Sequence, residues 1–269
     1  MKALAVVCPP RISFSSCSNS SWQQRHLRLQ SKPKSQLRIC SRFRVSSCLI
    51  KEGERQKHKG GVVDELLLNV FRNKMVKQVG WDSHKPGYDG LIEVANRMML
   101  NNPTNSDTKE AAVRVLISLF PPFLLELYKL LIAPIQGGKI AAFMVARVTA
   151  ISCQWLMGPC TVNSVDLPDG NSWTSGVFVE KCKYLEESKC VGICVNTCKL
   201  PTQSFFKDYM GVPLLMEPNF NDYSCQFKFG VLPPLPEDDA ALKEPCLAIC
   251  PNATRRRERN INIEQCPKA

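Results

Sequence analysis

Histidine is scarce in this 269-residue sequence, and none follows His84. A Ser–His or Cys–His nucleophilic pair in the C-terminal half is therefore excluded, because the general base of such a pair is missing. The sequence also lacks a GxSxG elbow, an HExxH motif and a glycine-rich phosphate loop. Hydrolase, zinc-peptidase and nucleotide-binding functions consequently have no support in its motifs.

Acidic residues are absent from residues 1–50, and the first is Glu52. The same segment contains nine basic residues and eleven serines. A composition poor in acids and rich in Arg and Ser is typical of an organelle transit peptide, and composition alone does not separate plastid from mitochondrion. The alternative is a disordered basic tail that binds nucleic acid or lipid.

The excess of positive charge belongs mostly to that leader. The whole chain carries a net charge of +11, whereas the residues after position 50 have 26 basic and 24 acidic side chains. A nucleic-acid partner is therefore not expected, because such proteins need a basic face that neutralises phosphates. Residues 253–269 contain the remaining basic cluster and are predicted to form a disordered basic tail.

No uncharged apolar run reaches the roughly 20 residues that a spanning helix needs. Residues 60–160 are instead predicted to form a helical region. Three helices are expected over residues 62–79, 123–132 and 139–157. Two more are expected between the first and second of these, one capped by Asp89 and one that begins with a capping box of Asp107 and Glu110. The last two are almost entirely apolar, which indicates a buried core, a slot for a long apolar ligand or a face that rests on a bilayer.

Residues 161–252 have a different pattern, with short strands and a high cysteine content. Hairpins are predicted over residues 162–179 and 213–229, with short helices between them and a new helix opening at Pro201 with Thr202 as its cap. The fold class is therefore α+β, with an N-terminal helical layer followed by a small Cys-rich part.

Seven of the fourteen cysteines lie between residues 182 and 250. These seven are the candidate metal ligands: Cys182, Cys190, Cys194, Cys198, Cys225, Cys246 and Cys250. Cys190, Cys194 and Cys198 recur at every fourth position, which places three sulfurs along one stripe of a helix. We expect these three as ligands, with the fourth among the other four candidates.

These thiols could bind a metal, form disulfides or act as a redox switch. A reducing organelle interior disfavours a static disulfide framework. Zinc is disfavoured because the short spacings are all Cys-x-x-x-Cys and histidine partners are lacking. Iron, as an all-thiolate site or an iron–sulfur cluster, therefore suits the pattern best. Cys153 and Cys160 are expected to be small buried residues.

Several spaced motifs resemble the plant plastid β-carotene isomerase family of the "dwarf twenty-seven" type. They are Phe178–Glu186, Cys190–Cys194, Cys198–Gln203, Met216–Asp222, Ser224–Cys225 and Glu244–Cys246 with Cys250. The resemblance covers roughly residues 88–250 and is dense after residue 178.

The resemblance implies a chloroplast location and an iron-dependent isomerisation of all-trans to 9-cis β-carotene, or a related interconversion, that feeds strigolactone synthesis. The implied partners are a carotenoid substrate and a membrane surface for access to it. The catalytic residues and the oligomeric state stay open. The alternative function is a non-catalytic plastid protein that binds a metal or senses redox state through the same thiols.

Overall fold

The computed structural model describes residues 61–258 together with Cys266 and Lys268. The predicted transit peptide over residues 1–50 and most of the predicted tail after residue 258 lie outside the described residues. The chain divides into residues 1–56 and residues 57–269. The segments 60–160 and 161–252 are therefore parts of one compact unit with a shared apolar core.

Three helices open this unit, namely α1 (Val62–Val79), α2 (Gly87–Asn101) and α3 (Asn105–Ile117). Helix α1 ends as expected at Gly80, whose φ of 71° lies in the left-handed region that glycine tolerates. Two predicted caps are wrong by a few residues. Pro86 rather than Asp89 precedes α2, and Thr104 caps α3 by accepting a hydrogen bond from the backbone N–H of Asp107.

The apolar segment that follows contains α4 (Leu124–Leu131), the short η1 (Ile135–Gly138), α5 (Lys139–Ser152) and α6 (Gln154–Met157). The helix predicted over residues 139–157 is thus divided at Cys153, whose backbone leaves the helical region. Helix α5 packs on the sheet through small residues such as Ala142 and Ala146, which allow close approach.

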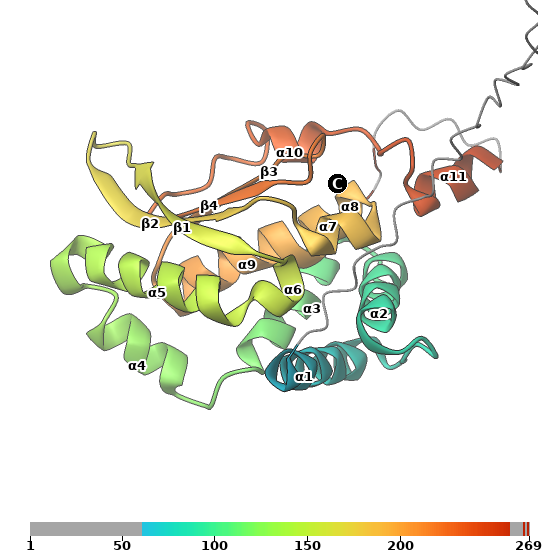
Figure 1. The fold of residues 1–269 in the computed structure, drawn as a ribbon, viewed down its shortest axis with the longest axis horizontal. Helices are drawn as coiled ribbons and strands as arrows, with labels where there is room; N and C mark the ends of the chain where they lie inside the picture. Colours follow the sequence, from blue (N-terminus) through green and yellow to red (C-terminus); the bar gives the residue numbers. More distant parts are fainter. Residues whose placement is uncertain (1–60, 259–265, 267, 269) are drawn as a thin grey trace, which may run out of the picture. The chain divides into compact units, whose positions relative to one another are not determined.

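Four antiparallel strands form one sheet in the order β1-β2-β4-β3. They are β1 (Cys160–Asp166), β2 (Ser172–Val179), β3 (Leu214–Pro218) and β4 (Cys225–Phe229), close to the two predicted hairpins. Val177, Phe227 and Met216 face one another across the register and are buried. Helices α5 and α9 cover this apolar face (Figure 1).

One continuous helical segment connects β2 to β3 after α7 (Lys183–Ser188). It consists of α8 (Val191–Ile193), the π-helical η2 (Cys194–Lys199), α9 (Leu200–Ser204) and the π-helical η3 (Phe205–Tyr209). The new helix predicted at Pro201 is therefore wrong, because the chain is already helical before it and Thr202 caps nothing. A proline lacks the N–H of an α-helical hydrogen bond, and the adjoining π-helical turn accommodates that loss.

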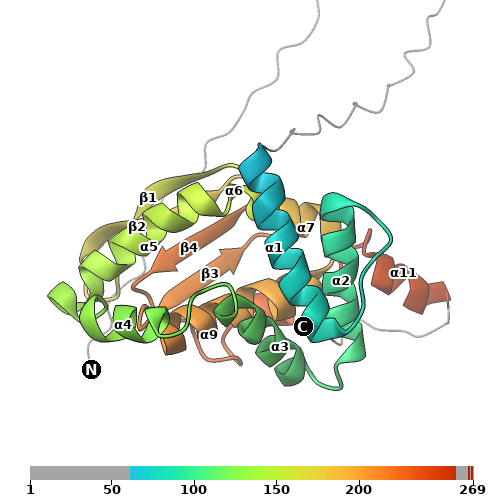
Figure 2. The same cartoon turned by 90° about the horizontal axis from the view of Figure 1, so that it is seen from below.

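Two short helices complete the described chain, α10 (Ala240–Lys243) beside edge strand β3 and α11 (Pro251–Glu258). Figure 2 shows the same unit from below, the side on which α1 and α4 lie relative to the sheet in Figure 1. Residues 253–258, predicted as the start of a disordered tail, are helical. The predicted α+β class is confirmed.

Candidate functional site

Four thiols gather where α8 and α11 meet, and we call Cys190, Cys246, Cys250 and Cys266 the C-terminal thiol group. The Cys190 and Cys250 thiols are hydrogen-bonded to each other, and so are those of Cys246 and Cys266. Cys190, Cys250 and Cys266 are buried, and Cys246 is half-buried. Residues distant in sequence therefore form one sulfur-rich cluster.

Within this group the pKa of the Cys250 thiol is lowered, while that of its partner Cys190 is raised. The Cys190 thiol, the backbone N–H groups of Ala253 and Asn252 and the charge of Arg256 lower the pKa of Cys250 to about 6. The proton is retained on Cys190, whose pKa is raised by the hydrogen bond to Cys250 and by burial. Cys250 immediately precedes α11, and a helix N-terminus favours a thiolate.

Polar side chains of α11 contact the sulfurs directly. Arg256 Nη2 lies 3.3 Å from Cys246 Sγ, and Asn252 Nδ2 lies 3.7 Å from Cys190 Sγ. The same Asn252 amide donates to Asn96 Oδ1 of α2 at 2.9 Å, which fixes its orientation. Such donors stabilise negative charge on sulfur, as they do around ligating thiolates.

Cys266 was missed by the sequence analysis, because it follows a polar stretch with no secondary-structure pattern. Its position depends on Gly192 of α8. A Cβ atom on Gly192 would lie 3.1 Å from Cys266 Sγ and 3.0 Å from Met99 Sδ. A glycine at position 192 lets Cys266 approach helix α8 closely. The one feature of the sequence that could have marked Cys266 as part of the site is that it is a cysteine.

A second cluster, the sheet-side thiol group, contains Cys182, Cys194, Cys198 and Cys225. Burial raises the pKa of Cys194, and the nearby sulfurs of Cys198, Cys182 and Cys225 raise it further. Burial likewise raises the pKa of Cys225, and that of Cys198 to about 12. These thiols are therefore neutral at physiological pH.

The structure thus separates Cys190 from Cys194 and Cys198, although the three share a four-residue spacing. Cys190 has extended backbone angles before the first turn of α8, and its partner is Cys250. Cys194 and Cys198 lie on the π-helical turn η2 instead. One helical stripe requires a regular α-helix through all three positions, and that helix does not exist here.

The donor atoms of these thiols suit iron, but their positions do not form a complete iron site. Soft sulfur donors, one of them a thiolate beside Arg256, are the ligands that iron accepts. Within residues 61–258, 266 and 268, however, no three His, Cys, Asp or Glu side chains converge so that they can share one metal ion. Cys153 and Cys160, expected to be buried, are half-buried and belong to neither group.

A buried ion pair lies next to the sheet-side thiol group. The Lys199 ammonium, at the end of η2, pairs with the Asp239 carboxylate, and both side chains are shielded from solvent. The other Asp239 oxygen accepts a hydrogen bond from the backbone N–H of Ala241 at 3.1 Å and so caps α10. The pair therefore connects the π-helical turn to the segment that covers β3.

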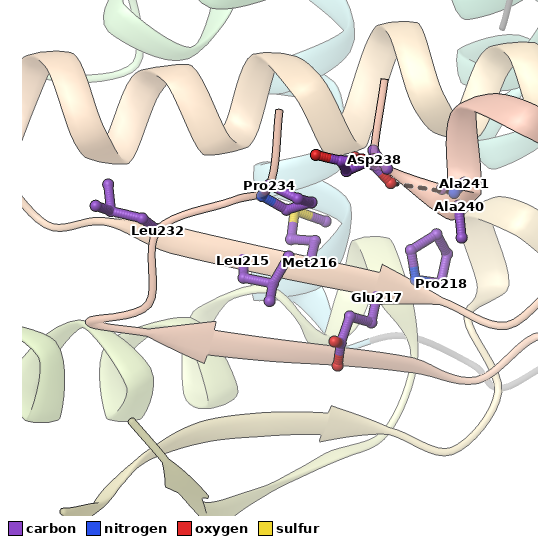
Figure 3. A pocket seen from close by; sticks show the side chains of 10 residues that line it. Leu215, Met216, Glu217, Pro218, Leu232, Pro234, Asp238, Ala240 and Ala241 are labelled. Atoms are coloured by element: carbon purple, nitrogen blue, oxygen red, sulfur yellow. Dashed lines mark hydrogen bonds between the residues drawn. The ribbon is translucent and has the colours of Figure 1, made fainter. Parts of the chain in front are cut away.

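A pocket of about 410 Å³ opens between β3 and the segment around residues 232–241 (Figure 3). Its lining is largely apolar and includes Leu215, Met216, Pro218 and Leu232. Pro218 is the register partner of Cys225, so the inner end of the pocket adjoins the sheet-side thiol group. Phe205 and Leu214, apolar residues of η3 and β3, are buried in the core and do not line the pocket.

Three carboxylates line the pocket, and two of them, Asp239 and Glu217, are paired with lysines, whereas Asp238 is exposed. Asp239 is neutralised by Lys199, and Glu217 forms a 2.7 Å ion pair with Lys228 on the outer face of the sheet. The site thus combines soft sulfur side chains with a largely apolar pocket in an α+β protein, and pockets of this kind are the usual binding places of apolar small molecules.

Comparison with known proteins identifies the family. Residues 155–238 match the family described as "Beta-carotene isomerase D27-like, C-terminal". The chain is 40% identical over 171 residues to beta-carotene isomerase D27, chloroplastic, from Arabidopsis thaliana, which covers 62% of each chain. It is 34% identical over 194 residues to the protein of the same name from Medicago truncatula, which covers 72% of this chain and 75% of the relative.

The chain therefore belongs to the D27-like family of β-carotene isomerases. The match spans about three fifths of the Arabidopsis relative and three quarters of the Medicago relative. Both relatives are named as chloroplastic, in agreement with the chloroplast location that the family resemblance implies. No solved structure matches the chain.

Proposed function

We propose that this protein is a plastid carotenoid cis–trans isomerase that interconverts all-trans and 9-cis β-carotene or a closely related pair. The observation that carries the proposal is the 34% identity to a named β-carotene isomerase across 75% of that relative's length. The matched family segment includes β1 to β4, the segment from Cys182 to Cys225 and most of the pocket lining.

The pocket supports this proposal by its chemistry. Its volume of about 410 Å³ lies within the usual range of ligand pockets, roughly 300–1,000 Å³. A hydrocarbon polyene offers no hydrogen-bonding group, so it needs an apolar lining and no buried unpaired charge. The ion pairs of Asp239 with Lys199 and of Glu217 with Lys228 neutralise two of the three carboxylates at the wall, and the third, Asp238, is exposed to solvent.

We further propose that activity depends on iron held by the C-terminal thiol group. The pKa of Cys250 is lowered, Cys190 is its hydrogen-bond partner, and Cys246 and Cys266 form the second pair of the group. Arg256 and Asn252 contact the sulfurs of Cys246 and Cys190, and the two pairs would have to move together to share one ion. When bound, thiolate-held iron supplies the one-electron chemistry that weakens a conjugated double bond. The residues of the chain orient the polyene, exclude water from it and hold the thiolate. We propose, on the strength of the family resemblance, that the product of this reaction feeds strigolactone synthesis.

The test is to incubate anaerobically purified protein with all-trans β-carotene and to separate the isomers by chromatography, with metal analysis on the same sample. The expected result is a time-dependent 9-cis product with an iron-loaded protein. An iron-loaded protein that changes no double bond in either direction would favour the alternative, a non-catalytic metal-binding or redox-sensing protein. The thiol clusters alone fit that second function equally well.

A further inference from the structure

The helices α4 and α5 expose an unusually apolar surface. Ten large apolar side chains between residues 123 and 151 are exposed, half of those in the described chain. The most exposed are Phe123, Leu130, Leu131, Val148 and Ile151, at 60–79% of their full area. Soluble monomers rarely leave so large an apolar area uncovered, so this surface is expected to have an occupant.

The exposed side chains follow the helical repeat rather than scattering. Along α5, Met144, Val148 and Ile151 form one outward stripe, while Ala142, Val145 and Ala146 face inward. Along α4, Leu124, Leu127 and Leu131 form a similar outward stripe. Figure 2 shows α4 and α5 next to each other on the same side of the sheet, so the two stripes belong to one region.

The helices cannot cross a bilayer singly, but they have the shape of an interfacial element. Among the described helices, none is long and apolar enough to span a membrane by itself. The segments Leu124–Leu131 and Ile135–Ser152 meet the length and composition requirement only together, and they are bent by 110°. A bent apolar pair of this kind can lie in the plane of the lipid surface.

The charges of this segment favour a lipid surface that is anionic. Residues 123–152 contain Lys129, Lys139 and Arg147 against a single acid, Glu126. The Arg147 guanidinium lies 3.3 Å from the centre of the Phe143 ring, so its charge sits directly beside an exposed apolar group. Basic side chains next to apolar ones reach lipid headgroups while their neighbours enter the acyl region.

We propose that residues 123–152 form a docking surface for a bilayer that contains anionic lipids, with α4 and α5 lying in its headgroup region. The inference extends the proposed function by giving the enzyme access to a membrane-dissolved substrate. Docking itself needs no carotenoid and no iron, so its failure and the failure of the proposed activity are distinguishable.

The test is hydrogen–deuterium exchange of the full chain, with and without vesicles of phosphatidylcholine and phosphatidylglycerol. We expect slower amide exchange within residues 123–152 when vesicles are present. Binding that protects only other segments, such as the basic leader, would overturn the proposal. Protection that rises with protein concentration in the absence of lipid would also overturn it, because a second copy of the chain would then be the occupant.

A second experiment measures vesicle binding by the variant Leu130→Gln/Ile151→Gln, which does not change the net charge. Removing two exposed apolar groups from the docking surface should lower the vesicle partition coefficient about tenfold. Leu232→Gln/Leu235→Gln is the matched control, because these leucines are similarly exposed but lie in the segment over β3. Equal partitioning of the two variants would contradict the proposal, and circular dichroism establishes that both are folded.

Discussion

The two thiol groups contain the same number of cysteines, but a thiol with a lowered pKa, Cys250, occurs in the C-terminal thiol group and not among the sheet-side thiols. In the C-terminal thiol group, a helix N-terminus, Arg256 and a neighbouring thiol lower the pKa of Cys250 to about 6. In the sheet-side thiol group, burial dominates and raises the pKa of Cys194 and Cys225. Cysteine count therefore does not identify a ligand set, because the surrounding donors decide whether a sulfur carries charge.

The largest expected effect concerns bound iron. Cys250→Ser should lose nearly all of it and more than about 100-fold in activity, because even outer-shell changes around a metal cost 10–100-fold. Cys194→Ser should keep its iron, contrary to the expectation from spacing alone. Metal analysis of both proteins decides between the groups, with Cys153→Ser as a control outside both. Iron lost only from a folded Cys194→Ser protein would assign the site to the sheet-side thiol group.

The buried Lys199–Asp239 pair gives the next largest effect, on stability. Lys199→Met leaves Asp239 buried without its partner and should lower the free energy of unfolding by about 3–5 kcal/mol. The double variant Lys199→Met/Asp239→Asn should recover much of the lost free energy of unfolding, because the neutral amide of Asn can still cap α10. Urea denaturation measures both changes.

The exposed Lys181–Glu186 pair, 2.7 Å apart, is the control for that experiment. Lys181→Met should cost less than about 1 kcal/mol, because water screens an exposed pair. Similar losses for Lys199→Met and Lys181→Met would show that the buried pair does not anchor the segment over β3.

Arg256 tests whether donors around the sulfurs matter to the C-terminal thiol group. Arg256→Gln removes the cation next to Cys246 and should speed the loss of iron to a chelator roughly tenfold. Arg257→Gln is the matched control, because Arg257 donates to the Ala248 carbonyl at 3.2 Å and is exposed. Equal rates of iron release from the two variants would show that Arg256 does not stabilise the bound iron.

The smallest effect is the pH dependence of stability in the metal-free protein. Between about pH 6, the pKa of folded Cys250, and its ordinary value of 9.0, the unfolded chain binds more protons at this thiol. The free energy of unfolding should therefore rise with pH in that window. Above pH 9.0, the free energy of unfolding should fall with pH, because Cys194 and Cys225 stay protonated in the folded chain and lose their protons in the unfolded one.

Urea midpoints measured across this pH range check that expectation. Cys250→Ser should flatten the rise below pH 9.0, whereas the fall above it should persist because Cys194 and Cys225 still contribute to it. Parallel curves for the wild type and the variant would show that Cys250 titrates in the folded chain as it does in the unfolded one.

Much of the local structure could be predicted because it depends on nearby residues. The pattern from Val62 to Val79 and the stop at Gly80 gave α1 within its observed bounds, and both hairpins were found from alternation and turn residues. The helix through Pro201 was not predicted, since a π-helical turn has no recognised sequence signal and local rules place proline at a helix start.

The sequence by itself determined the α+β class, the apolar character of α4 and α5, the family and the importance of the thiols, since composition and spacing encode these directly. Only the tertiary structure decided that Cys190 pairs with Cys250 rather than with Cys194, and that Cys266 joins them beside Gly192. The reason is physical: a thiol's partners and charge depend on which helix ends, cations and buried surfaces the fold brings to it, and sequence separation does not measure those distances.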